Sequence, residues 1–192
     1  MDLAATAQDW IVAYWHHPPY SKGSHDSDTE GRLVEMREYV VPLLDDYGVD
    51  LTFAGHSHSY ERSFLIEGHY GNSTTFAESM KVDPGNGRIA EDGPYIKPVM
   101  GPNPYSGIVH TVAGNGGLVS GGSLDHPAMY VAFNTLGSVV LDVEANRLDA
   151  TFIDATGTIL DSFTVYKDFC TSDVDGDDVC DNNDNCVDDP PH

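Results

Sequence analysis

The chain has 192 residues, of which 40% are hydrophobic, so it is long enough for one domain with a sizeable core. Its formal net charge is -22, with nine lysine and arginine residues against 31 acidic ones, and such a surface repels the phosphate backbone of nucleic acids. The sequence has no apolar run of about 18 residues, so it predicts no membrane span.

The first predicted element is an apolar, β-prone strand over residues 10–15 that leads directly into two histidines. His16 and His17 are followed by Pro18 and Pro19, and proline holds the residue before it in extended geometry, so no helix begins here. Neighbouring side chains on an extended backbone point to opposite faces. We therefore expect at most one of these two histidines to face a shared site and the other to point away from it.

A helix is predicted next, over residues 33–47, because its apolar side chains recur at spacings of three and four. Ser27 or Thr29 is expected to cap its start, and Gly48 fits just past its end. The residues that carry this pattern are Leu33, Met36, Val40, Leu43, Leu44 and Tyr47.

The second predicted strand covers residues 49–54 and is followed by Gly55, His56 and His58. On extended backbone, histidines two residues apart point to the same side. A right-handed crossover through the helix makes the two strands parallel, so both histidine sites come to the same edge of the sheet. Ligands of open α/β sheets bind at that edge, and paired imidazoles suit metal ions.

The rest of the chain predicts a loop and then a β-rich part. Residues 67–105 are rich in glycine, proline, asparagine and serine, which predicts a long loop or insertion over the active edge. Residues 107–114 return to a strand. Three segments that alternate apolar and polar residues then predict an antiparallel meander, at 137–143, 147–153 and 159–166.

The composition changes after Lys167, which predicts a core domain over 1–168 and a separate acidic tail over 169–192. The aspartates of the tail alternate around Gly176, a pattern that suits calcium, which takes many oxygen ligands on a flexible loop. The expected calcium ligands are Asp173, Asp175, Asp177, Asp181 and Asp184.

The cysteines lie only in this tail, at Cys170, Cys180 and Cys186. Cysteines beside a calcium-binding loop favour an oxidising location, either secreted and extracellular or periplasmic. Three is an odd number, so one thiol is expected to lack a partner, and the pairing stays open.

Two segments carry a family resemblance: WHHPPYSKGSH at 15–25 and DLTFAGHSHSYER at 50–62. They resemble the purple acid phosphatases, within the calcineurin-like metallophosphoesterases, and the likeness extends over about residues 8–166. It implies an α/β (α+β) fold, namely the C-terminal half of a four-layer α/β/β/α sandwich. The tail resembles a thrombospondin type 3 calcium-binding repeat that is cut short at His192.

The resemblance also implies roles for individual residues. His16 and His56 would bind one metal and His58 a second, and His25 would contact the phosphate of a phosphomonoester substrate. The two ions would be iron together with zinc, manganese or iron, and they would activate the attacking water. This would make the protein a phosphoric monoester hydrolase of the acid phosphatase kind.

Other motifs of the resembled family are not found in this sequence: an early aspartate, a GD-x-x-Y segment and a GNH segment. They are expected upstream of residue 1, so the chain is expected to be a truncated fragment, inactive alone, whose partner is the missing N-terminal half. Two alternatives stay open. One is a secreted, non-catalytic module that attaches through its calcium-bound tail, and the other is a nucleotide phosphodiesterase with the same G-H-x-H signal.

Overall fold

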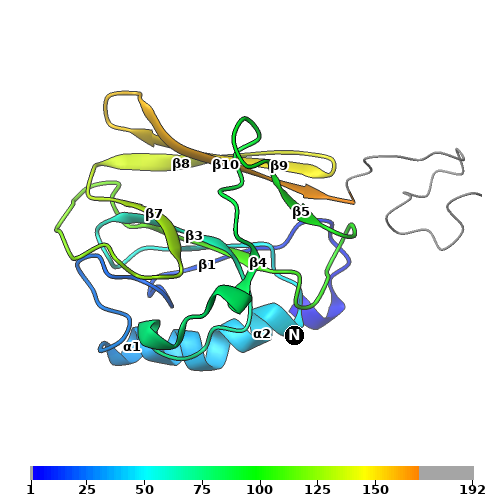
Figure 1. Ribbon diagram of the computed structural model, residues 1–192, viewed down its shortest axis with the longest axis horizontal. Coiled ribbons are helices and arrows are strands. Elements are labelled where there is room, and N and C mark those ends of the chain that lie inside the picture. The colour runs from blue at the N-terminus through cyan, green and yellow to red at the C-terminus, as the bar shows by residue number, and fades with distance from the viewer. Residues whose placement is uncertain (1, 169–192) are drawn as a thin grey trace, which may run out of the picture.

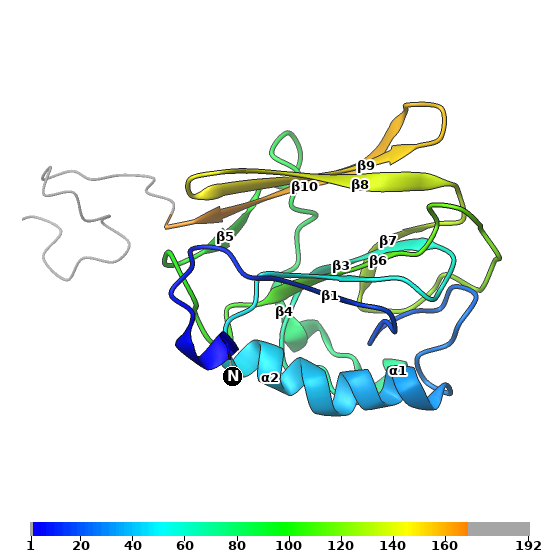
Figure 2. The same ribbon diagram turned by 180° about the vertical axis from the view of Figure 1, so that it is seen from behind.

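The computed structural model describes residues 2–168, which fold into a layer of helices and two β-sheets stacked on one another (Figure 1). The helices cover one face of the first sheet, and the second sheet covers the other face, as the reverse view also shows (Figure 2). Residues 2–168 thus contain three of the four expected layers. No helix in this range is long and apolar enough to cross a membrane.

The first sheet has the strand order β1-β2-β6-β3-β4, with β7 paired to β3. Its strands are β1 (Val12–Trp15), β2 (Leu51–Ala54), β3 (Tyr60–Ile66), β4 (Lys81–Asp83), β6 (Ile108–Ala113) and β7 (Met129–Phe133). β1, β2 and β6 run parallel, with Val12 beside Leu51 and Trp15 beside Ala54. The predicted parallel pairing of the two histidine-bearing strands is therefore confirmed.

The crossover between β1 and β2 is helical, as predicted, and consists of α1 (Gly31–Glu35), a π-helical turn η2 (Met36–Val40) and α2 (Val41–Asp46). Pro42 accounts for the wider turn, because a proline ring clashes with the carbonyl four residues earlier in a regular helix. The predicted Ser27 or Thr29 cap is wrong. The N-cap is Glu30, whose side chain makes no capping hydrogen bond. Gly48 follows the helix at φ +64°, a conformation that glycine adopts at little cost.

The second sheet has the order β5-β10-β9-β8. Its strands are β5 (Tyr95–Lys97), β8 (Gly137–Glu144), β9 (Arg147–Asp154) and β10 (Ile159–Lys167). β8, β9 and β10 form the predicted antiparallel meander. The single long loop expected over 67–105 is wrong. This segment contains two short 3₁₀ helices, η3 (Ser73–Thr75) and η4 (Glu78–Met80), and the strands β4 and β5. Lys97 of β5 pairs with Asp50 at the amino end of β2, away from the histidines.

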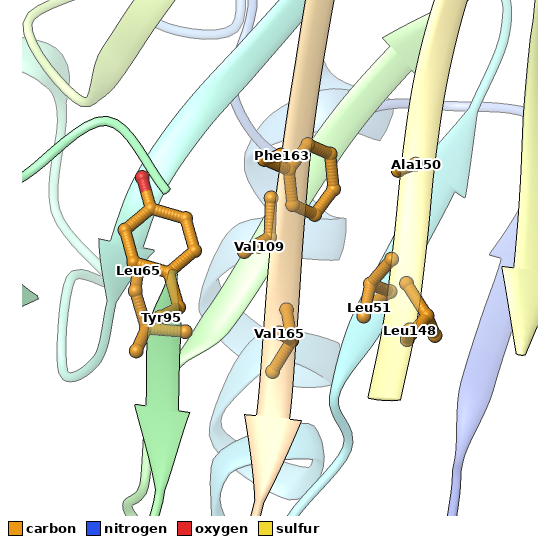
Figure 3. Packing of buried hydrophobic residues seen from close by; sticks show 8 residues of the cluster. All are labelled: Leu51, Leu65, Tyr95, Val109, Leu148, Ala150, Phe163 and Val165. Carbon is orange, nitrogen blue, oxygen red and sulfur yellow. The ribbon is translucent and has the colours of Figure 1, made fainter. Parts of the chain in front are cut away.

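The main core lies between the two sheets (Figure 3). Leu51, Leu65 and Val109 of the first sheet pack against side chains of the second, and all of them are at most 2% exposed. Their partners are Tyr95, Leu148, Ala150, Phe163 and Val165. A second cluster fills the space under the helices, with Leu44, Val49 and Ile108 at its centre.

Two buried ionic networks also join the sheets. Arg62 of β3 donates to both carboxylate oxygens of Asp161 on β10, at 2.6 and 2.9 Å, and both side chains are 0% exposed. At the amino end of β2, Asp50 accepts from Lys97 at 2.6 Å and from Lys167 at 2.8 Å. Because a buried charge is costly unless it is paired, these contacts hold the register of one sheet over the other.

The sandwich is open on the side of β1 and β8. Among residues 2–168, β1 pairs only with β2, and β8 pairs only with β9. Side chains on the inner faces of the two sheets are buried in the middle of the sandwich but exposed at this side. Tyr14 of β1 is 84% exposed and Val143 of β8 is 47% exposed. The Trp10 indole donates to the Ala145 carbonyl at 2.8 Å, which ties the start of the β1 segment to the β8–β9 turn on this same side.

Candidate metal centre

Four histidine rings and one carboxylate meet beyond the carboxyl ends of β1 and β2. His56 lies at the centre of this group, with its Nδ1 at 3.0 Å from the Nε2 of His16. The rings of His17 and His25 lie next to His56, with centroids 4.6 and 3.8 Å from its centroid. Glu30, at the start of α1, approaches the other ring nitrogen of His56 at 3.5 Å.

The backbone around His56 brings these rings together. β2 ends at Ala54, and the Gly55 N–H donates to the His16 carbonyl at 3.1 Å, which joins the two strand ends. His56 has φ +57°, and the Ser57 N–H donates back to the Gly55 carbonyl at 2.6 Å, so residues 55–57 form a tight three-residue turn. For a residue other than glycine, this backbone conformation costs about 1–3 kcal/mol of conformational free energy. Such conformations occur most often at functional sites.

This turn changes the expected geometry of the histidine pair. His56 and His58 do not lie on extended backbone, so their side chains do not follow the alternation of a strand and are not directed to the same side for that reason. His58 lies outside the central group: its Nδ1 is 3.2 Å from the Ser120 hydroxyl, and its ring centroid is 6.5 Å from that of His25. The turn also packs closely on Gly114, where a Cβ would come within 2.0 Å of the Ser57 carbonyl oxygen.

His17 does not point away from the site, contrary to the expectation. β1 ends at Trp15, so the alternation of an extended strand has stopped before His16 and His17 are reached. The Trp15 indole donates to the His17 carbonyl at 2.7 Å and holds the bend. Both rings therefore lie beside His56.

Two overlapping groups of potential metal ligands result, and they share His56. In each of them the ligand atoms all lie within 4.8 Å of one another. The first consists of His16, His17 and His56, and the second of His25, Glu30 and His56. Burial, followed by the charges of neighbouring histidines, lowers the pKa of both His17 and His56, which favours the neutral imidazole that metals require.

The loop that carries His25 is held from below by one buried carboxylate. Glu61 of β3 is 0% exposed and accepts from the hydroxyls of Ser21 at 2.6 Å and Ser59 at 2.8 Å. It also accepts from the Lys22 N–H at 3.0 Å. Burial raises the pKa of Glu61. The His25 ring is held in turn by Glu30, whose two oxygens lie 2.7 and 2.9 Å from its Nδ1.

Three further histidines lie in a separate, buried cluster. The rings of His69, His110 and His126 surround Tyr20, with centroids 5.3, 4.9 and 5.5 Å from its ring. Both ring nitrogens of His69 and the Nε2 of His126 have no hydrogen-bond partner among the described residues.

The sequence reasoning missed two members of the central group, His17 and Glu30. Glu30 follows His25 by five residues in a polar loop, and no periodicity marks it. The expected tail ligands Asp173 to Asp184 lie outside the described residues, as does the proposed calcium site.

Comparison with known proteins finds related sequences and folds. Residues 2–60 match the family model of the calcineurin-like phosphoesterases. Acid phosphatase A of Cryphonectria parasitica is 30% identical over 174 residues, which cover 86% of this chain and 29% of that protein. Purple acid phosphatase 15 of Arabidopsis thaliana is 35% identical over 107 residues, which cover 48% of this chain and 19% of that protein.

The fold is similar to that of part of a purple acid phosphatase. The structure of purple acid phosphatase PPD1 from yellow lupin seeds matches with a TM-score of 0.64 and 20% identity, over 87% of this chain and 27% of that one. The chain thus spans less than a third of the length of these relatives.

Proposed function

We propose that this chain is a calcineurin-like metallophosphoesterase, and that it forms part of a metal-dependent phosphoric monoester hydrolase of the acid phosphatase kind. One observation carries the proposal. His16, His56 and His25, from three separate segments, converge with Glu30 at the carboxyl ends of parallel strands. That is the edge at which open α/β sheets bind their ligands.

The residues present fit a metal. Imidazole nitrogens with one carboxylate suit borderline transition metals such as zinc, iron or manganese. In our proposal His16 and His56 hold one ion and His58 contributes to a second. When bound, such ions lower the pKa of water and stabilise charge on a phosphoryl group. The remaining ligands of a two-metal centre would come from polypeptide outside residues 2–168. We propose that the N-terminal half of the same protein supplies them and is the partner of this chain.

His25 is the proposed contact to the substrate phosphate. Its ring lies against that of His56 and is 30% exposed, so an incoming phosphomonoester can reach it. Glu30 holds the Nδ1 of His25, so the opposite ring nitrogen is the one directed to a substrate, either donating to a phosphoryl oxygen or protonating the leaving alcohol. The strong negative charge of the chain makes local positive charge necessary for an anionic substrate to bind.

This proposal predicts that the chain binds phosphate but hydrolyses a phosphate ester slowly or not at all. The full chain, supplied with zinc or manganese, should bind orthophosphate, and His25→Ala should weaken that binding by about tenfold, the effect of losing one charge-assisted hydrogen bond. Hydrolysis of p-nitrophenyl phosphate by the same sample should be slow or absent, because the metal ligands are incomplete. Calorimetry and a colorimetric assay measure the two quantities.

Two results would contradict it. Absence of orthophosphate binding with every metal tested would remove the phosphoesterase assignment and favour a non-catalytic attachment module. Robust turnover that disappears in His56→Ala would show that this chain holds a complete centre and needs no partner.

The acidic tail carries a separate proposal, calcium binding outside the cell or in the periplasm. We expect a peptide of residues 168–192 to bind calcium at about 10⁻⁴–10⁻³ M, the range of extracellular modules. Amide NMR shifts during a calcium titration measure this, and Asp175→Asn with Asp177→Asn should weaken it. Unchanged shifts at millimolar calcium would mean that the tail is only a solvated acidic segment.

A further inference from the structure

The three rings of His16, His17 and His56 form a group that is compact enough for a single ion. Their centroids are 4.8, 4.8 and 4.6 Å apart, and one ring nitrogen from each histidine lies within 4.8 Å of the other two. Tetrahedral zinc holds its imidazole nitrogens at about 2.0–2.1 Å, which places them roughly 3.4 Å from each other. The 3.0 Å between His56 Nδ1 and His16 Nε2 already approaches that spacing.

Backbone hydrogen bonds position this group. The Gly55–His16 hydrogen bond joins the strand ends, and the Trp15–His17 hydrogen bond fixes the bend that turns His17 inward. Pro18 after His17 restricts the backbone further. Little ordering is therefore left to occur when an ion binds, and this favours affinity.

The two ring nitrogens of His56 face different ligand groups. Its Nδ1 faces His16, while its Nε2 lies 3.5 Å from a carboxylate oxygen of Glu30. A histidine that binds metal through one nitrogen commonly donates its other N–H to a carboxylate, which fixes the tautomer and strengthens the ligand. Glu30 is placed to act in this way, so the second group supports the first instead of competing with it.

We propose that His16, His17 and His56 bind one divalent transition-metal ion of the zinc type, with His17 as a direct ligand and Glu30 as the carboxylate behind His56. Three imidazoles leave a fourth position open for water or substrate, as in catalytic zinc sites. The inference concerns the metal-binding step of the proposed function and rests on it. It goes beyond the proposed function in two respects: the chain by itself binds one ion, and His17 is a direct ligand of that ion.

The test measures metal binding without substrate. The full chain, with its cysteines alkylated by iodoacetamide so that tail thiols cannot bind, is titrated with Zn²⁺ by calorimetry and with Co²⁺ by visible absorption. We expect one tight ion per chain. His17→Ala should weaken binding by about 100-fold, since even loss of a supporting partner costs 10–100-fold. Glu30→Gln should cost about tenfold. Glu35→Gln, which changes an exposed carboxylate outside both ligand groups, should leave affinity unchanged. Circular dichroism establishes that each variant is folded.

NMR of the histidine ring nitrogens identifies the ligands directly. Saturation with Zn²⁺ should shift ring signals of His16, His17 and His56, while those of His58 stay in place. Unshifted His17 signals, or an affinity that depends on His25 and Glu30 but not on His17, would overturn the inference while leaving the phosphoesterase proposal intact. Two tight ions with His58 signals shifted would overturn it in favour of a two-metal centre within this chain.

Discussion

The chain should unfold cooperatively as the pH falls from about 6.5 toward 4. His69, His110 and His126 are only 1–2% exposed. Burial lowers the pKa of His69 to about 4 and the pKa values of His110 and His126 to about 3. The charges near them are those of Arg37, Asp28 and Lys22, and like-charged His69 further lowers the other two values. A proton on any of these rings is far less favourable in the folded chain than in the unfolded chain.

The direction and size follow from linkage. Since the pKa values are lower in the folded state, the stability that these groups provide is complete above pH 6.5 and is lost as the pH falls toward the folded-state values. Each histidine then costs about 3 kcal/mol by pH 4, and the three together roughly 10 kcal/mol. That equals the whole stability of many domains. The buried carboxyl of Glu61, whose raised pKa favours its protonated form, offsets part of this loss.

Far-ultraviolet circular dichroism and tryptophan fluorescence between pH 7.5 and 3 measure this transition. His69→Phe is the informative variant, because the His69 ring lies between Tyr20 and Phe76 and neither of its nitrogens has a partner. It should lower the midpoint by about one pH unit. His58→Gln, which alters a histidine outside the cluster, should not move it. A chain that stays folded at pH 3 would contradict the prediction.

Asp161→Ala should destabilise the fold by about 3–5 kcal/mol, because it leaves the fully buried Arg62 guanidinium without its counter-charge. The same carboxylate accepts from the Tyr60 hydroxyl at 2.8 Å and from Arg88 at 3.0 Å. Hydrogen bonding and charge pairing with Arg62 hold the pKa of Asp161 below its usual value despite burial.

Urea unfolding at pH 7.5 measures the loss as a lower midpoint at unchanged slope. Arg88→Ala is the matched control. Its side chain is 25% exposed, so we expect a loss of at most about 1 kcal/mol. Replacing both charges, Arg62→Met with Asp161→Leu, should recover most of the stability, since no unpaired charge remains. If Asp161→Ala and Arg88→Ala were equal in effect, the Arg62 pairing would not be what joins the sheets.

Strands and helices with a clear period were predictable from the sequence. β1, β2, β6 and the meander β8–β10 alternate or are continuously apolar, and the crossover helix repeats every three to four residues. β3 carries no such signal, although it lies inside the first sheet. Its residues Glu61, Arg62 and Ser63 are all 0% exposed, and their polar groups are satisfied by partners distant in sequence, such as Ser21 and Asp161.

The candidate site shows the same limit. His16 and His56 follow predicted strands, so topology brings them together. His17 joins them only because β1 ends one residue before His16, and strand ends are the least certain part of a sequence-based prediction. Glu30 lies beside His25 and His56 because the loop before α1 packs on β3, where the Lys22 N–H donates to Glu61. No local pattern encodes such a long-range contact.

The open side of the sandwich makes the stability of this chain depend on its surroundings. Within residues 2–168, β1 and β8 each have one unpaired edge, whose backbone N–H and C=O groups are available to any strand that reaches them, and exposed Tyr14 and Val143 add apolar contact. A strand that pairs there binds the folded chain and not the unfolded one. By mass action it adds about 2.7 kcal/mol at 100 times its dissociation constant. Melting temperatures of this chain should therefore rise with the concentration of whatever polypeptide fits these edges, although no residue of the chain has changed.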